Sequence, residues 1–133
     1  MPHLNWLAVL AAAVSTFALG GLWYSKGLFG RAWMSVNNLT EADLAQGNMV
    51  KIFGLSFVFA VIMAANLAAF LADAKTNAVW GATAGFLAGF GWVALGIATI
   101  ALFERRSWKY ILINGGYVTA SFVIMGLIIG AWR

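Results

Sequence analysis

Four long apolar segments constrain the fold of this chain more than any other feature. They run over residues 6–24, 50–72, 78–103 and 111–132. Apart from Lys51, next to the start of the second, they contain no Lys, Arg, Asp, Glu or His. Each exceeds the ~18 residues expected of a membrane-spanning helix. Because a helix satisfies its own backbone polar groups inside a bilayer, the sequence predicts an all-α integral membrane protein, a compact bundle of four transmembrane helices.

The length leaves room for one domain, because four spans of about 20 residues and their connections use up the chain. We therefore assign residues 1–133 to a single transmembrane domain. A cleavable signal peptide is the competing interpretation of the first run, since Ala18-Leu19-Gly20 loosely resembles a cleavage site. The residues before the run supply no Lys or Arg, which a signal peptide needs. We expect the first run to be a span.

The composition argues against several kinds of chemistry. The chain has no cysteine, which excludes disulfides, thiol chemistry and cysteine-ligated metal sites. The one histidine, His3, cannot form a polyhistidine metal site, and no partner for nucleophilic catalysis is identifiable beside it. The net charge of +4 lies in the connections between apolar runs and does not indicate nucleic acid. We expect no enzymatic activity, no cofactor and no metal.

The basic residues indicate an orientation. Two of the three connections carry most of them: Lys26, Arg31, Lys51, Arg105, Arg106 and Lys109. The opposite side has only Lys75 and Arg133. Because Lys and Arg are enriched in cytoplasmic loops, we expect both basic connections in the cytoplasm and both termini outside it. The expected location is the inner (plasma) membrane.

The first connection is the only one with room for structure of its own. Phe29 and Trp33 are four residues apart with cations nearby, as in a short helix lying in the membrane interface. Thr40-Glu41-Ala42-Asp43 resembles a capping box that starts a second short helix. A helical excursion and an ordered loop anchored by aromatic side chains remain equal alternatives. The residues expected to contact lipid headgroups are Arg31, Trp33, Arg105, Arg106 and Lys109.

Small residues at helical spacing mark the faces along which membrane helices pack. The clearest stripe is in the third span: Gly81, Gly85, Gly89, Trp92, Gly96 and Thr99. This spacing predicts one face, with Trp92 as the only large side chain. Shorter stripes occur on the other spans: Ala13, Thr16 and Gly20; Ala60, Ala64 and Ala68; Gly115, Thr119, Gly126 and Gly130. Packing within the chain is the favoured interpretation, and contact between copies is the alternative.

Polar side chains within spans are costly unless paired, so they are candidates for function. Asn66 lies on the second span, and Asn114, Tyr117 and Ser121 share a face of the fourth. If these faces meet Trp92, the bundle centre holds amide, phenol and indole groups without charge. The polar groups then either hold helices together or line a neutral cavity. With no intramembrane carboxylate or histidine, proton-coupled transport is disfavoured.

Several short motifs carry a family resemblance. Asn5-Trp6-Leu7-Ala8-Val9 leads into Gly21-Leu22-Trp23-Tyr24-Ser25, and then into Leu28-Phe29-Gly30 with Trp33. Leu39-Thr40-Glu41 and Gly91-Trp92 follow. In these elements the chain resembles the bacterial family labelled domain of unknown function 1761, over nearly its whole length. The resemblance implies a four-helix membrane protein and adds no activity, catalytic residue or ligand residue.

The leading hypothesis is a non-enzymatic membrane protein that self-associates and holds or passively conducts a neutral or lipidic small molecule. The candidate ligand-facing or packing residues are Trp92, Asn66, Asn114, Tyr117, Ser121, Gly85, Gly89 and Gly96. The alternative is a non-catalytic accessory subunit of a larger membrane complex. The expected partners are the lipid bilayer and either copies of the chain or another membrane protein.

Overall fold

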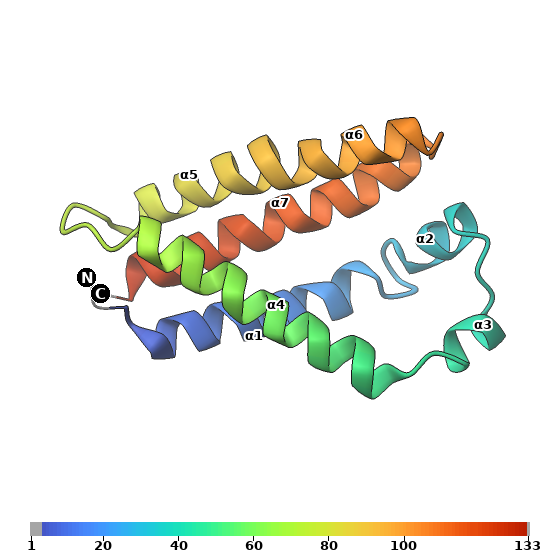
Figure 1. The fold of residues 1–133 in the computed structure, drawn as a ribbon, viewed down its shortest axis with the longest axis horizontal. Helices are drawn as coiled ribbons and strands as arrows, with labels where there is room; N and C mark the ends of the chain where they lie inside the picture. The colour runs from blue at the N-terminus through green and yellow to red at the C-terminus, as the bar shows by residue number, and fades with distance from the viewer. Residues whose placement is uncertain (1–3, 133) are drawn as a thin grey trace.

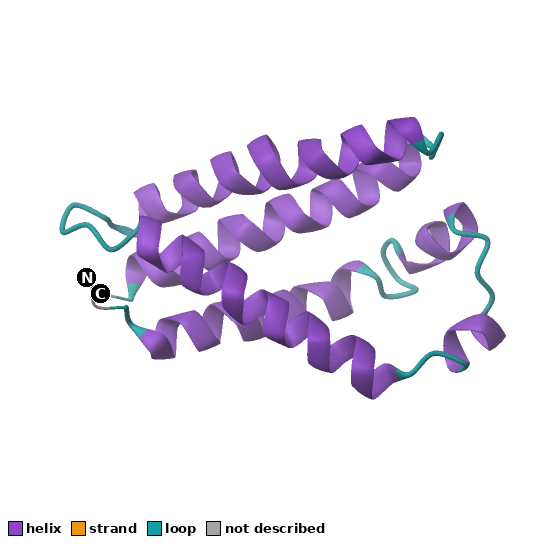
Figure 2. Cartoon of the chain, in the orientation of Figure 1, coloured by secondary structure: helices purple, strands orange, loops and turns teal. Residues whose placement is uncertain are grey.

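All regular secondary structure in the described part of the chain is helical (Figures 1 and 2). The computed structural model describes residues 4–132, and these contain no strand. Four helical stretches are long and apolar enough to cross a membrane: α1 (Trp6–Trp23), α4 (Met49–Phe70), Ala78–Phe103 and α7 (Trp108–Ala131). The third stretch has three parts: α5 (Ala78–Ala88), the π-helical turn η1 (Gly89–Ala94) and α6 (Leu95–Phe103). The predicted all-α fold with four spans is confirmed.

Side-chain caps fix where the four spans begin. Their N-cap residues are Asn5, Asn48, Asn77 and Ser107, and the side-chain oxygen of each accepts a backbone N–H of the first turn. Such a cap satisfies a donor that has no partner within the helix. The cap at Ser107 explains why α7 begins at Trp108, before the apolar run itself.

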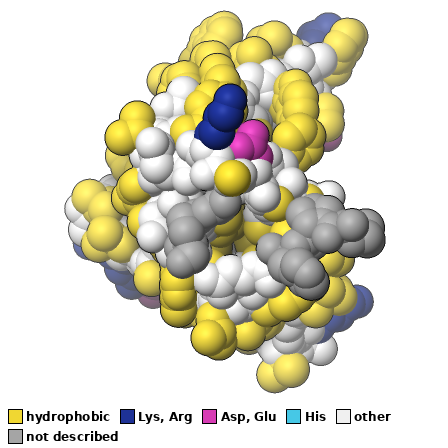
Figure 3. Space-filling view, turned by 90° about the vertical axis from the view of Figure 1, so that its left-hand side faces the viewer, with side chains coloured by type: hydrophobic (Ala, Val, Ile, Leu, Met, Phe, Trp, Pro, Cys, Tyr) yellow, Lys and Arg dark blue, Asp and Glu magenta, His cyan; other side chains and the backbone are white. Residues whose placement is uncertain are grey.

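α7 is the central helix of the bundle. It packs against α5 and η1 on one side and against α1 on the other, while α4 packs chiefly on α1. The start of α1, the end of α7 and the 71–77 loop lie at one end, here called the terminal end (Figure 1). The opposite, basic end holds α2 (Gly30–Val36), α3 (Glu41–Ala45) and the 104–107 turn. Hydrophobic side chains surround the molecule when it is viewed from the terminal end (Figure 3), as expected of lipid-facing helices.

The first connection forms two short helices, which decides between the two alternatives left open by the sequence. In α3 the predicted capping box is present: the Thr40 hydroxyl accepts the Asp43 N–H, and the Asp43 carboxylate accepts the Thr40 N–H. An ion pair between Lys26 and Glu41 joins α3 to the end of the first span, and the hydrogen bond from Lys26 lowers the pKa of Glu41.

Glycines let α5 and α7 touch backbone to backbone. A Cβ built on Gly81 meets the carbonyl oxygen of Gly126 at 2.1 Å, and one on Gly85 meets that of Phe122 at 2.1 Å. Cβ atoms essentially never approach closer than 3.0 Å to such atoms, so no larger residue fits without separating the helices. This part of the glycine stripe packs within the chain, as the favoured interpretation predicted.

The stripe turns away from α7 after Gly89, because η1 is a π-helical turn that accommodates one extra residue. In a regular α-helix Ala94 lies about 140° from Gly89, but with one residue absorbed it lies about 40° away. Ala94 and Ala101 are therefore buried, whereas Gly96 and Thr99 are exposed. The prediction that Gly96 and Thr99 continue the packing face is wrong, because it assumed an uninterrupted α-helical period.

Candidate functional site

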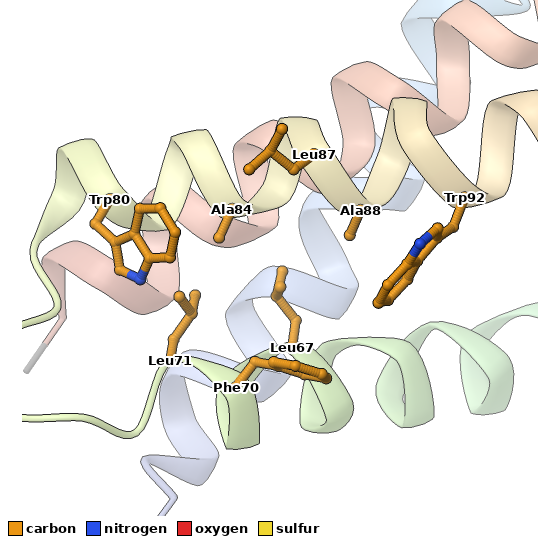
Figure 4. Close-up of a pocket in the computed structure, with 8 residues that line it drawn as sticks. All are labelled: Leu67, Phe70, Leu71, Trp80, Ala84, Leu87, Ala88 and Trp92. Atoms are coloured by element: carbon orange, nitrogen blue, oxygen red, sulfur yellow. The ribbon is translucent and has the colours of Figure 1, made fainter.

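An apolar pocket of about 280 Å³ lies between the C-terminal part of α4 and the third span (Figure 4). All eight lining side chains are apolar or aromatic: Leu67, Phe70, Leu71, Trp80, Ala84, Leu87, Ala88 and Trp92. The pocket opens on the surface of the bundle, where Phe70 is 73% exposed and Trp92 71% exposed. It is therefore a side pocket.

The inner wall of the pocket belongs to the hydrophobic core. Leu67 and Leu71 are buried and pack with Phe122, Met125 and Ile129 of α7. These contacts fix the wall, because a closely packed core adjusts little. The side chains that are free to adapt to a ligand are those at the rim.

Two tryptophans bound the pocket along the third span. Both indole rings point toward α4 (Figure 4), and the rings of Trp92 and Phe70 lie 6.5 Å apart in an edge-on arrangement. In a regular α-helix Trp92 lies within about 20° of Gly85 and faces α7. The π-helical turn rotates it away, so the predicted insertion of Trp92 into the glycine groove is wrong. Within residues 4–132 neither Trp80 nor Trp92 uses its indole N–H in a hydrogen bond.

The predicted neutral polar centre does not form. Asn66 is exposed on the side of α4 opposite the buried Ala60, Ala64 and Ala68. Its amide donates to the Ile62 carbonyl oxygen in its own helix, at 2.9 Å. α4 packs inward with its alanine face because small side chains allow close approach to α1. The hypothesis that both amides meet Trp92 is therefore wrong.

The other polar candidates lie at the contact between α1 and α7. Three hydrogen bonds cross it: Trp23 Nε1 to the Ile113 carbonyl oxygen (2.9 Å), Tyr24 Oη to Asn114 Oδ1 (2.7 Å) and Tyr117 Oη to the Thr16 carbonyl oxygen (2.8 Å). Ser121, one turn after Tyr117, is buried, and its hydroxyl has no hydrogen-bond partner among residues 4–132. Asn114 and Tyr117 thus join two helices.

Sequence analysis treated Trp23 and Tyr24 only as part of a family motif and missed their hydrogen bonds to α7. A signal existed in two glycines, Gly116 opposite Trp23 and Gly20 opposite Tyr117. A Cβ on Gly116 meets the Trp23 ring at 2.9 Å, and a Cβ on Gly20 meets the Tyr117 hydroxyl at 3.2 Å. A bulky aromatic side chain on one helix needs such a gap on its neighbour.

A polar hollow lies at the basic end, between the end of α2 and the 104–107 turn. Its lining residues are Ser35, Val36, Asn38, Glu104, Arg105, Arg106 and Ser107. The Arg106 guanidinium lies 4.9 Å from the centre of the Tyr110 ring and donates to Asn37 Oδ1 at 3.4 Å. Arg105 is exposed and makes no ion pair with any described residue.

The remaining predicted headgroup contacts do not line this hollow. Arg31 and Lys109 are exposed, and the Trp33 ring packs edge-on against that of Tyr24 at 5.8 Å. His3 lies outside the described residues. Between residues 4 and 132, no group of three or more His, Cys, Asp or Glu residues is placed to hold a metal ion.

Four apolar helices that pack through glycine and alanine faces, with an apolar side pocket and no charged side chain among the buried residues of the described chain, define a small helical membrane protein. The chain belongs to the family described as Protein of unknown function (DUF1761), whose sequence model matches residues 7–130. The resemblance carried by the N-terminal motif and Gly91-Trp92 is thereby confirmed. Comparison with curated proteins and with solved structures gave no match.

Proposed function

We propose that this protein holds an apolar or lipidic molecule in the pocket between α4 and the third span. The observation that carries this proposal is a pocket of about 280 Å³ with only apolar and aromatic lining. When the four helices span a bilayer, its opening faces the hydrocarbon. Lipid tails are as apolar as the pocket, so the ligand is held by close van der Waals contact with the rings.

The proposed role is holding rather than conducting. A conducting path for a neutral molecule needs a continuous cavity between the helices. The polar side chains of α1 and α7 instead bond across their contact, and Leu67 and Leu71 close the inner side of the pocket. The proposed role is also non-catalytic, since the lining supplies no nucleophile, acid or base.

We further propose that the basic end faces the cytoplasm, in an inner membrane, and that both termini lie outside. The distribution of Lys and Arg between the two ends supports this orientation. Arg105, Arg106 and the neighbouring cations then lie where anionic headgroups bind. Copies of the chain are proposed to self-associate in the plane of the membrane.

Filling the pocket tests the proposed function. The protein is purified in mild detergent, and the molecules that it retains are measured by native mass spectrometry. Ala88→Leu places extra side-chain volume in the pocket, whereas Ala18→Leu adds the same side chain at an exposed position of α1. We expect retained lipid or apolar ligand in the wild type and in Ala18→Leu, and its loss in Ala88→Leu. Equal retention in all three would refute the proposal.

The same spectra test the competing role. An accessory subunit should be isolated with foreign protein subunits and an empty pocket. That result would also overturn the proposal that the protein acts by holding a small molecule.

A further inference from the structure

The outward face of α4 carries one amide among apolar side chains. Asn66 is exposed, and its large exposed neighbours on this helix are Phe59 (57%), Ile62 (53%), Met63 (38%) and Phe70 (73%). Apart from Phe70, whose ring faces Trp92 across the mouth of the pocket, no described contact to another helix is made by these side chains, because α4 packs through its opposite, alanine-rich side. An exposed apolar face is ordinary in a membrane, but an amide within it is not.

The amide of Asn66 is only partly satisfied. A carboxamide offers two N–H donors and a carbonyl oxygen that accepts. One N–H bonds the Ile62 carbonyl oxygen at 2.9 Å, and no other described residue bonds the side chain. Thr83 and Thr99 are also exposed, but each donates its single O–H to a carbonyl four residues back, at 2.8 Å. Asn66 alone among these three keeps an unused donor.

The position of Asn66 along α4 places the amide inside the hydrocarbon. α4 has 22 residues, or about 33 Å at 1.5 Å per residue, against a hydrocarbon core of about 30 Å. Asn66 lies four residues, about 6 Å, before the last helical residue, and Leu71 and Ala72 extend the apolar run. Its side chain has one methylene group, so it cannot reach the headgroups as Lys and Arg do.

We propose that a second copy of this chain covers the Asn66 face of α4, and that the two Asn66 amides pair with each other. This inference rests on the self-association proposed above and names its surface. Lipid tails have no donor or acceptor to satisfy an amide. Copies inserted in the same orientation hold Asn66 at the same depth, and a two-fold axis normal to the membrane brings identical residues together. Each amide then donates an N–H to the Oδ1 of the other.

Single cysteines test this contact cleanly, because the chain contains none. Met63→Cys lies on the proposed face, one turn before Asn66, and Leu127→Cys lies at an exposed position of α7. Both variants are oxidised in native membranes, and disulfide-linked dimers are measured on non-reducing gels. We expect a linked dimer for Met63→Cys and monomer for Leu127→Cys.

Substitution of the amide tests the polar contact. In the Met63→Cys background, Asn66→Leu should weaken association by about threefold to thirtyfold, the range for hydrogen bonds between membrane helices. Asn66→Gln, which keeps a carboxamide, should retain it. Thr83→Val is the matched control, since it removes a hydroxyl already satisfied in its own helix. Unchanged thermal unfolding of Asn66→Leu at high detergent, where the protein is monomeric, checks that the variant folds.

The outcomes separate the proposals. If the wild type is monomeric in membranes, both the proposed self-association and the proposed contact through the Asn66 face are wrong. The pocket proposal is then tested separately by the ligand measurement. A dimeric wild type that Asn66→Leu leaves intact, without a Met63→Cys cross-link, overturns the Asn66 face alone. A foreign protein cross-linked to Met63→Cys in place of a second copy also overturns it.

Discussion

Replacing Gly81 by alanine perturbs the contact between α5 and α7, and the size of the perturbation follows from the distance between the added Cβ and the backbone of α7. The added Cβ lies 2.1 Å from the Gly126 carbonyl oxygen and must reach at least 3.0 Å, so the backbones have to separate by 0.9 Å or more. The obstacle is backbone, which cannot rotate away as a flexible side chain does. Gly126 meets the Gly81 carbonyl oxygen in the same way, at 2.0 Å.

The cost follows from this separation. A gap of about 0.5–1 Å loses about a quarter to a half of the dispersion energy of each contact that it opens. Overpacking of this kind costs about 1–3 kcal/mol in soluble proteins, partly offset by the helix propensity of alanine, about 1 kcal/mol better than that of glycine. We therefore expect Gly81→Ala to lower the free energy of unfolding by about 1 kcal/mol, the middle of that range less the propensity gain. Replacing both Gly81 and Gly126 by alanine should cost less than the sum of the two single substitutions, because one separation of the helices relieves both clashes.

Gly96 supplies a matched control in the same span. A Cβ there meets nothing within 4 Å, so Gly96→Ala should be neutral or stabilise by up to about 1 kcal/mol. The assay is reversible unfolding in mixed detergent micelles, followed by circular dichroism. If Gly81→Ala is as stable as Gly96→Ala, the backbone contact between α5 and α7 is not as close as described and the reasoning fails.

Three further predictions concern other parts of the chain. Gly30→Ala should destabilise by about 1–3 kcal/mol, because its Cβ lies 2.3 Å from a backbone oxygen; Gly27→Ala, with only one atom within 4 Å, should change the unfolding free energy by less than about 0.5 kcal/mol. Ser121→Ala removes a buried, unpaired hydroxyl and should raise the free energy of unfolding by about 1 kcal/mol. Hydrogen bonds from Thr40 hold the pKa of Asp43 below its usual value. The stability that the ionised Asp43 carboxylate gives to α3 is therefore present near neutral pH and is lost as the pH falls through that lowered pKa. Amide exchange in α3, corrected for its intrinsic pH dependence, should lose protection only in that acidic range.

The spans and much of their packing could be predicted from local features of the sequence. An apolar run without charge has few alternatives to a spanning helix. Gly81, Gly85 and Gly126 mark a close backbone contact because each lacks a Cβ, and this holds whichever helix is the partner. The Thr40 capping box is likewise local, since both of its bonds lie within four residues.

The pocket could not be predicted from the sequence, because it depends on which faces of the helices pack against one another. The second span offers a polar face with Asn66 and an alanine face with Ala64, and the sequence does not rank them. Contact with the alanine-rich α1 selects the alanine face. The π-helical turn is also set by tertiary contact: at Gly89 a Cβ meets Phe122 Cβ at 2.6 Å, so α5 is pressed against α7 just where the turn begins.

The extra residue in η1 separates the two roles of the third span. Gly81, Gly85 and Gly89 face α7 and hold the bundle, while Trp80 and Trp92 face the pocket. The turn allows both, because it rotates Trp92 toward α4 and then brings Ala94 and Ala101 back to the side of the span that faces α7.

This interpretation predicts that one deletion in the span is tolerated and another is not. Deleting Gly91, where an added Cβ would meet nothing within 4 Å, converts η1 to a regular α-helix and leaves Ala94 and Ala101 facing α7. Deleting Gly96, where an added Cβ would likewise meet nothing within 4 Å, rotates the rest of α6 by about 100° and turns Ala101 out of its buried site. The free energy of unfolding of the Gly91 deletion should therefore lie within about 1 kcal/mol of the wild-type value, since the deletion replaces one irregular turn by a regular one. That of the Gly96 deletion should be lower by more than this. Equal stability of the two deletions would show that the π-helical turn does not set the register of α6, because a residue removed at either position would then be accommodated in the same way.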